Sequence, residues 1–141
     1  MGLVEISDIR DLIAFLPILV KKHKELGGYW EADLSTEDFV AALTNKFGKG
    51  VTYYGIKNGD QLVYFIALIH VNDSSVNFWL FYIDKNYHQH TKNLILMLKN
   101  VYKEKGYRTA TFVTSRITRS YDRWVSKFGA TKSLLTYKLE L

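Results

Sequence analysis

The spacing of hydrophobic residues divides this chain into helical and extended segments. Four segments repeat apolar side chains every three or four positions, as one face of an α-helix does. They span residues 8–25, 35–47, 87–105 and 115–128. Six others are short apolar runs or are rich in the β-branched and aromatic residues typical of strands. They span residues 3–6, 51–57, 61–71, 76–83, 108–114 and 134–141. The predicted order is therefore β-α-α-β-β-β-α-β-α-β.

Capping and turn residues mark the ends of several segments. Ser35 and Asp38 form a capping box that opens the second helix. Asn58-Gly59 lies between two strand segments and predicts a tight hairpin, because both residues tolerate positive φ. Pro17 lies inside the first helical segment, so we expect it to kink that helix or to split it in two.

The order of the segments predicts the fold class. Three antiparallel strands are followed by a strand-helix-strand unit over residues 76–114, whose two strands should be parallel with a right-handed crossover. This mixture is typical of an α+β fold with a mixed, mostly antiparallel sheet. The chain has 141 residues and no low-complexity tract or Pro/Ser-rich linker, so we expect a single domain over residues 1–141.

The absence of cysteine narrows the chemistry. Without Cys, disulfides, thiolate zinc sites and thiol nucleophiles are excluded. His88 and His90 are two positions apart, with no Cys and no suitably placed carboxylate, and this does not favour a metal site. The longest apolar run, Leu12–Val20, is too short to span a bilayer. We therefore expect a cytoplasmic protein that does not associate with membranes.

The formal charge is unevenly divided along the chain. Residues 1–84 carry 7 basic and 11 acidic side chains, a net charge of −4. Residues 85–141 carry 12 basic and 3 acidic side chains, a net charge of +9. This asymmetry favours an anionic ligand or partner for the second part of the chain, and a solvated lysine-rich helix face is the alternative.

The junction between the strand segment 76–83 and the helical segment 87–105 is the first candidate site. A strand that passes through a short polar turn into a helix points backbone N–H groups at whatever lies in front of the helix, and the helix dipole adds positive potential there. The junction therefore predicts a phosphate or pyrophosphate site. Its turn contains no glycine, although phosphate-binding loops usually use glycine for close backbone approach.

Three segments make the chain similar to the GNAT acyltransferase superfamily. Phe81–Tyr87 resembles the end of the family's fourth strand, and His88–Asn93 falls where the family carries an Arg/Gln-x-x-Gly-x-Gly/Ala motif. Ser120–Ala130 resembles the family's last helix. The resemblance covers essentially the whole chain. It implies a GNAT-like α+β fold with about four helices, in which the parallel strands 76–83 and 108–114 splay apart.

The resemblance also implies acetyl-CoA as the cofactor. In the family, the backbone amides of the turn hold the pyrophosphate, and the opened fourth strand hydrogen-bonds the pantetheine arm. Here Thr91 and Asn93 would replace the two motif glycines, and Lys92 could pair with a phosphate. The implied cofactor-binding residues are Ile83, His88, Gln89, His90, Thr91, Lys92 and Asn93.

The resemblance further implies a general acid and a general base. The family's usual acid is a Tyr four residues before the glycine that ends the last helix, and this position is Val125 here. Tyr121, one helical turn earlier, is the remaining candidate. The usual base is a carboxylate on or near the fourth strand. Asp84, at the end of that strand, and Glu31, on the loop expected to wall the acceptor site, are the candidates and could act through water.

Several functions remain open on these residues. The first is a divergent acyl-CoA-dependent N-acyltransferase that acts on an amine-bearing small molecule or protein. The second is a catalytically inactive GNAT-fold protein that binds a protein partner or forms a homo-oligomer, for example in a bacteriophage virion. The third is a nucleic-acid-binding module, because Arg116, Arg119 and Arg123 repeat at helical spacing beside Tyr121 and Trp124.

Overall fold

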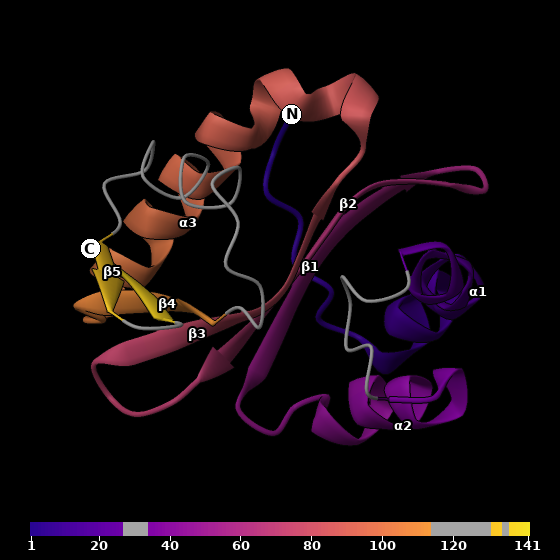
Figure 1. Ribbon diagram of the computed structural model, residues 1–141, viewed down its shortest axis with the longest axis horizontal. Helices are drawn as coiled ribbons and strands as arrows, with labels where there is room; N and C mark the ends of the chain where they lie inside the picture. Colours follow the sequence, from indigo (N-terminus) through magenta and orange to yellow (C-terminus); the bar gives the residue numbers. More distant parts are fainter. Residues whose placement is uncertain (27–33, 114–130, 134–135) are drawn as a thin grey trace.

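A mixed sheet runs through the centre of the protein, with helices on both of its faces (Figure 1). The structure is a computed structural model, and it describes residues 1–26, 34–113, 131–133 and 136–141. Within these ranges the helices are α1 (Ile9–Leu26), α2 (Thr36–Lys46), the 3-10 helix η2 (Lys85–His90) and α3 (Thr91–Glu104). The strands are β1 (Val51–Asn58), β2 (Gln61–His70), β3 (Ser75–Ile83), β4 (Thr109–Val113), β5 (Thr131–Ser133) and β6 (Thr136–Glu140).

The strands lie in the order β1-β2-β3-β4-β6-β5. Neighbouring strands are antiparallel except for β3 and β4, which are parallel and are connected through η2 and α3. This confirms the predicted α+β architecture with one parallel strand-helix-strand pair. The predicted fourth helix, over residues 115–128, lies outside the described residues.

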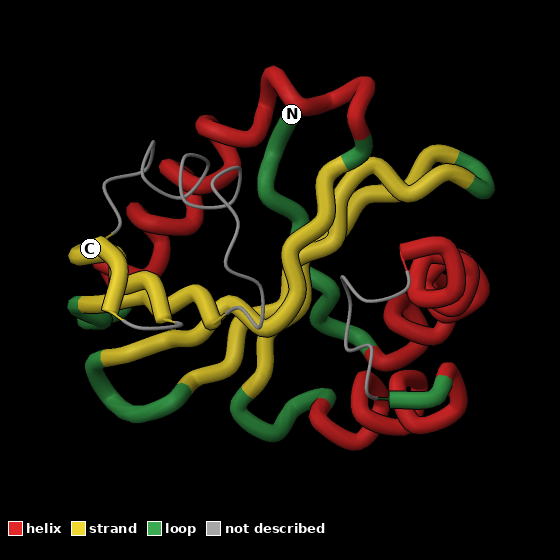
Figure 2. The backbone as a smooth tube through the Cα atoms, in the orientation of Figure 1, coloured by secondary structure: helices red, strands yellow, loops and turns green. Residues whose placement is uncertain are grey.

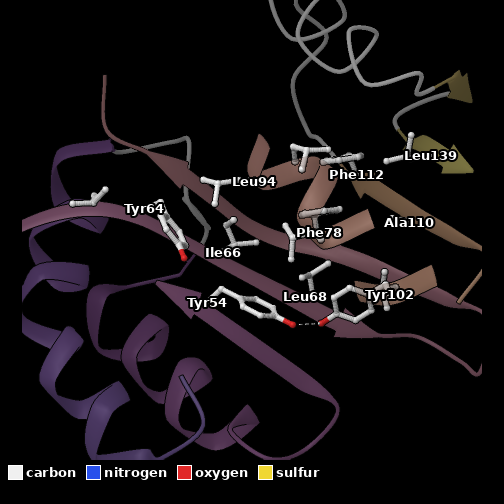
Figure 3. Packing of buried hydrophobic residues seen from close by; sticks show 14 residues of the cluster. Tyr54, Tyr64, Ile66, Leu68, Phe78, Leu94, Tyr102, Ala110, Phe112 and Leu139 are labelled. Carbon is white, nitrogen blue, oxygen red and sulfur yellow. Dashed lines mark hydrogen bonds between the residues drawn. The ribbon is translucent and has the colours of Figure 1, made fainter. Parts of the chain in front are cut away.

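Helices α1 and α2 cover one face of the sheet and α3 covers the other (Figures 1 and 2). Successive strand residues point to opposite faces: Tyr53 and Phe65 belong to the buried cluster on the α1/α2 side, whereas Tyr54 and Ile66 belong to the cluster on the α3 side. Figure 3 shows the α3-side cluster. Because the sheet is covered on both faces, its central strand β2 is buried at every position from Leu62 to Leu68.

Two local predictions are confirmed. The Ser35 hydroxyl accepts a hydrogen bond from the Asp38 backbone N–H at 3.1 Å and caps α2, as the capping box predicts. The hairpin between β1 and β2 forms as well, although its turn is displaced by one residue. Asn58 still pairs with Gln61, so the turn consists of Gly59 and the residue after it, and Gly59 has a φ of 61°.

Two other expectations need correction. Helix α1 is not split at Pro17 but continues from Ile9 to Leu26, held on the sheet by buried side chains both before and after the proline. Residues 3–6 do not form a strand; they make an isolated bridge to β1. The Tyr64 hydroxyl accepts from the Val4 N–H at 2.8 Å and donates to the Gly2 C=O at 2.9 Å. Because the Val4 N–H and the Gly2 C=O bond to this hydroxyl, they are not available to pair with a neighbouring strand.

Candidate functional site

A β-bulge in β3 changes which of its residues face each side of the sheet. The register with β2 pairs Phe78 with Leu68 and Leu80 with Ala67, two residues that are consecutive on β2. Trp79 is therefore an extra residue in the ladder. The residues that face α3 before and after the bulge are three positions apart instead of two. An extra residue of this kind bends the strand and increases its twist.

The parallel pairing between β3 and β4 stops at the bulge. Only Ser75–Phe78 pairs with Thr109–Phe112, while β3 continues to Ile83 beside β2. Among the described strands, none occupies the β4-side edge of β3 beyond Phe78. The rings of Phe78 and Phe112 stack 4.3 Å apart at 5° and close the last pair. The two strands therefore splay apart from a packed point, as predicted.

The backbone groups of Phe81 and Ile83 point toward this open edge. The Asp84 N–H donates to the Val63 C=O on β2 at 2.8 Å, which places Asp84 in a hydrogen-bonded pair with β2. Successive strand residues alternate in the direction of their N–H and C=O groups, so those of Ile83 and Phe81 point away from β2. An extended ligand can pair with such an edge as an added strand would.

The open edge leads directly into residues 85–93, which we call the β3–α3 turn. The sequence predicts an α-helix from residue 87. In the structure, residues 85–90 form the 3-10 helix η2, and α3 begins at Thr91. None of the η2 side chains is buried. The segment therefore lacks the apolar stripe that would hold a longer α-helix against the sheet.

The N-terminus of α3 carries no acidic side chain, although the Thr91 N–H already donates to the His88 C=O. Its N-cap residue, His90, makes no side-chain capping hydrogen bond, and the first turns of η2 and α3 contain no acidic residue. Lys92 and Asn93 are exposed in the first turn of α3. Thr91, which replaces a motif glycine, is only 8% exposed, so its side chain is turned into the fold. The helix dipole and Lys92 together make this terminus positive.

Asp84 is 8% exposed and is surrounded by hydrogen-bond donors. Its carboxylate accepts from the Asn86 N–H at 2.9 Å and from the Tyr82 hydroxyl at 3.3 Å. The Asn86 N–H is the main cause that holds the pKa of Asp84 below its usual value. Gln61, Tyr82 and Lys22 lower this pKa further, while burial opposes them. These surroundings suit a permanent capping anion, whereas a general base benefits from a raised pKa.

A hollow of about 420 Å³ lies beside Asp84, between α1, the β1–β2 turn and the start of β2. Its polar lining includes Lys22 and Gln61. Sequence reasoning did not identify this surrounding group, nor Trp79 as the bulge residue. Lys22 and Gln61 are far apart in the sequence from Asp84, and no local motif connects them. The pairing of β2 with β3 brings Gln61 beside Asp84, and the packing of α1 against the sheet adds Lys22.

The other predicted site residues fall into two groups. The predicted cofactor-binding residues, from Ile83 and from His88 to Asn93, lie together at the end of β3 and in the β3–α3 turn. Glu31, Tyr121 and the arginines at 116, 119 and 123 lie outside the described residues. In the part of the chain that the structure describes, no three His, Asp or Glu side chains gather to hold a metal ion, and no helix is long and apolar enough to cross a membrane.

Comparison with known proteins gives a structural answer. No protein-family model and no curated protein sequence matches the chain significantly, whereas many solved structures match. An acetyltransferase from Streptococcus agalactiae matches with a TM-score of 0.75 at 10% identity, over 99% of this chain and 98% of that one. A GNAT-family acetyltransferase from Staphylococcus aureus matches with a TM-score of 0.70 at 17% identity, over 99% of both chains. The protein has a GNAT fold.

The GNAT fold accounts for the site geometry at the level of the backbone. The PaiA N-acetyltransferase of Thermoplasma acidophilum, whose structure contains coenzyme A, matches with a TM-score of 0.63 at 17% identity, over 99% of this chain and 98% of that one. Strand β3 corresponds to the strand that the sequence comparison placed fourth in the family. In this chain, that strand runs past the end of the β3–β4 pairing into the turn before α3.

Proposed function

We propose that this protein is a divergent acyl-CoA-dependent N-acyltransferase, which transfers an acetyl group from acetyl-CoA to an amine. The observation that carries the proposal is the continuity of two features. The open edge of β3, at Phe81 and Ile83, leads straight into the β3–α3 turn, where α3 begins without a side-chain cap. Acetyl-CoA carries an extended pantetheine arm joined to a pyrophosphate, so one ligand matches both features.

The turn supplies donors of the right kind for a pyrophosphate. Exposed Lys92 provides a mobile positive charge, and exposed Asn93 provides an amide donor beside it. Because Thr91 is buried, its side chain does not project from the exposed surface of the turn. The Thr91 N–H itself donates to the His88 C=O, so the proposed phosphate contacts are the exposed side chains of Lys92 and Asn93. Exposed His88 and Gln89 complete the proposed cofactor-binding set.

The reaction requires little of the protein beyond placement and one proton acceptor. The amine nitrogen attacks the thioester carbonyl of acetyl-CoA, a C–N bond forms, and the C–S bond breaks as the CoA thiolate leaves. A base takes the proton from the amine nitrogen, and an acid protonates the leaving sulfur. Glu31 is the proposed base and Tyr121 the proposed acid. The acceptor is proposed to be an amine-bearing small molecule or protein.

The comparisons support this proposal through the fold. The structures that match include N-acetyltransferases, one of them with coenzyme A bound. Their identities to this chain are low, and so the support extends to the fold. A catalytically inactive protein with the same fold, the alternative that the sequence leaves open, is separated from an enzyme by the experiment below.

The first experiment measures cofactor binding. Purified protein is titrated by isothermal calorimetry with acetyl-CoA, and with desulfo-CoA and ADP for comparison. We expect saturable binding of acetyl-CoA at micromolar concentration. The Lys92→Glu variant should weaken this binding at least tenfold, because a carboxylate then faces the pyrophosphate. Lys49→Glu is the matched control, since it makes the same charge change in an exposed loop away from the turn.

Turnover is then followed through the free CoA thiol, released in a screen of small amines and peptides. Binding that Lys92→Glu abolishes and Lys49→Glu spares, together with thiol release, supports the enzyme. Saturable binding without transfer to any amine favours the inactive scaffold. Absence of binding up to millimolar acetyl-CoA contradicts the acyltransferase proposal.

A further inference from the structure

Every polar group of Asp84 is engaged where β3 meets the β3–α3 turn. Its N–H donates to the Val63 C=O at 2.8 Å, and its C=O accepts from the Tyr87 N–H at 2.9 Å. One carboxylate oxygen accepts from the Asn86 N–H at 2.9 Å, and the other accepts from the Tyr82 hydroxyl at 3.3 Å. A single residue therefore ends the β2–β3 ladder, forms the first hydrogen bond of η2 and caps that helix.

Lys22, on α1, is a cation that lines the same hollow as Asp84. The ammonium group of Lys22 lies 5.0 Å from the centre of the Tyr82 ring and 3.2 Å from the Glu25 carboxylate. The Lys22 side chain is only 22% exposed, so it is held in place by the packing of α1 on the sheet. Lys22 and Tyr82 thus connect the Asp84 carboxylate to the α1 layer.

The β3–α3 turn has little else to define its shape. None of the η2 side chains is buried, and 3-10 helices have weaker hydrogen-bond geometry than α-helices. Within η2, the half-buried Tyr87 packs against the α3-side cluster. The backbone of residues 85–90 is otherwise held at its two ends. One end is the start of α3, and the other is the Asp84 cap. Loosening the cap would oblige a ligand to order the turn on binding, which lowers affinity.

We propose that Asp84 is a positioning residue: together with Tyr82 and Lys22 it fixes the β3–α3 turn that receives the pyrophosphate of acyl-CoA, and it does not take the proton of the acceptor amine. This inference rests on the proposed function, because it concerns the same cofactor site. It assigns Asp84 a different role from the general base that the sequence predicts.

Two substitutions separate the two roles. Asp84→Asn removes the basic carboxylate but keeps an oxygen that can accept from the Asn86 N–H, and Asn caps helices about as well as Asp. Asp84→Ala removes both. A positioning role predicts that Asp84→Ala weakens CoA binding about tenfold, with Asp84→Asn close to wild type. A role as general base predicts instead that both variants lower kcat about a hundredfold or more, without a change in CoA affinity.

The measurements are chosen to locate the effect. CoA and pantetheine are titrated against each variant, and kcat and KM are measured with the best acceptor from the amine screen. We expect the affinity loss of Asp84→Ala for CoA and none for pantetheine, which lacks the pyrophosphate, and a raised KM for acetyl-CoA with kcat within about twofold. Asp60→Asn is the control, because Asp60 is exposed and lines the same hollow. Unchanged CoA affinity in Asp84→Ala, or an inactive Asp84→Asn, overturns the proposal.

A second readout is independent of the cofactor. Backbone amide exchange, followed by NMR, should show faster exchange at Asn86 and Tyr87 in Asp84→Ala and wild-type rates in Asp84→Asn. If wild-type protein does not bind CoA, the proposed function fails, and these rates alone decide whether Asp84 fixes the turn. If Asp84→Ala does not fold, Tyr82→Phe replaces it, with a smaller loss of CoA affinity expected. Unchanged amide exchange in the variant contradicts the positioning role.

Discussion

The two ends of β3 differ in how fully their polar groups are satisfied within the fold. At its start, the Ser75 C=O accepts from the Val71 N–H at 3.0 Å, and the Ser75 and Thr109 hydroxyls lie 2.8 Å apart across the parallel pair. At its other end, the backbone groups of Phe81 and Ile83 face an edge that no described strand covers. One end of β3 is thus closed within the fold, and at the other end the described strands leave an edge uncovered.

A polar network, half-buried at His70 and buried at Tyr54 and Tyr102, lies at the closed end. His70, at the end of β2, places Nδ1 2.6 Å from the Tyr107 hydroxyl and Nε2 2.9 Å from the Thr52 hydroxyl. The hydroxyls of Tyr54 and Tyr102 lie 3.2 Å apart nearby (Figure 3), and burial raises the pKa of both. Such satisfied networks hold a unique arrangement, because a buried polar group without a partner is costly. The comparison suggests that a rigid closed end allows the other end to stay open.

Removing the ring that closes the last β3–β4 pair should have the largest effect. Phe112→Ala deletes a buried side chain, 2% exposed, that stacks on Phe78. We expect a loss of about 3–5 kcal/mol in the free energy of unfolding, measured by urea denaturation, because a cavity remains where the strands diverge. Leu96→Ala, at a 45% exposed position on α3, is the control and should change stability by less than about 0.5 kcal/mol. A small effect of Phe112→Ala would show that the splay does not depend on this contact.

A change at the hairpin tip should cost less and spare the site. Gly59 has a φ of 61°, and a Cβ placed there meets nothing within 4 Å. Gly59→Ala should therefore destabilise the fold by about 1 kcal/mol through backbone strain alone, with CoA affinity unchanged. Thermal unfolding and calorimetry measure the two quantities. An affinity loss would mean that the hairpin takes part in the open end.

The pH dependence of the free energy of unfolding should be the smallest of these effects. It tests one titratable side chain near each end of β3, His70 and Asp84. Burial, with a smaller contribution from Lys105, holds the pKa of His70 below its usual 6.5. The unfolded chain then binds more protons than the native protein below about pH 6.5, so the stability that His70 contributes is lost as the pH falls through that value. Asp84, whose pKa is also lowered, contributes stability above about pH 3.8 that is lost only in stronger acid.

The His70 contribution can be isolated with a single variant. Denaturation curves between pH 7.5 and 5 are measured for the wild type and for His70→Gln. The two proteins share the other three histidines. We expect a shallower decline in the free energy of unfolding for His70→Gln. Equal slopes would show that His70 titrates as it does in the unfolded chain.

Local signals in the sequence predicted much of the fold. The capping box at Ser35 and the turn glycine at Gly59 act within a few residues, and both appear where expected. The order of segments was enough to predict the parallel β3–β4 pair. Of the two outcomes expected at Pro17, the split does not occur, because α1 is held by burial on both sides of the proline.

The bulge and the support of Asp84 were not predictable in the same way. Strand β3 is covered on both faces and is apolar at most positions, so no alternation shows where its register shifts at Trp79. Tyr82 contacts Asp84 from two positions earlier on β3, whereas Lys22 comes near Asp84 only through the packing of α1. The proposed cofactor-binding segment is continuous in the chain and could therefore be named from the sequence, while Glu31 and Tyr121 lie outside the described residues.

The bulge at Trp79 corresponds to a very small change in the gene. Without this residue, Phe78 and Leu80 would follow each other in a regular ladder against the consecutive residues Leu68 and Ala67. The difference between a regular β2–β3 ladder and one with this bulge is therefore one codon. An insertion of this size preserves the pairing on both sides of it, so the regular and the bulged ladder are a single mutational step apart.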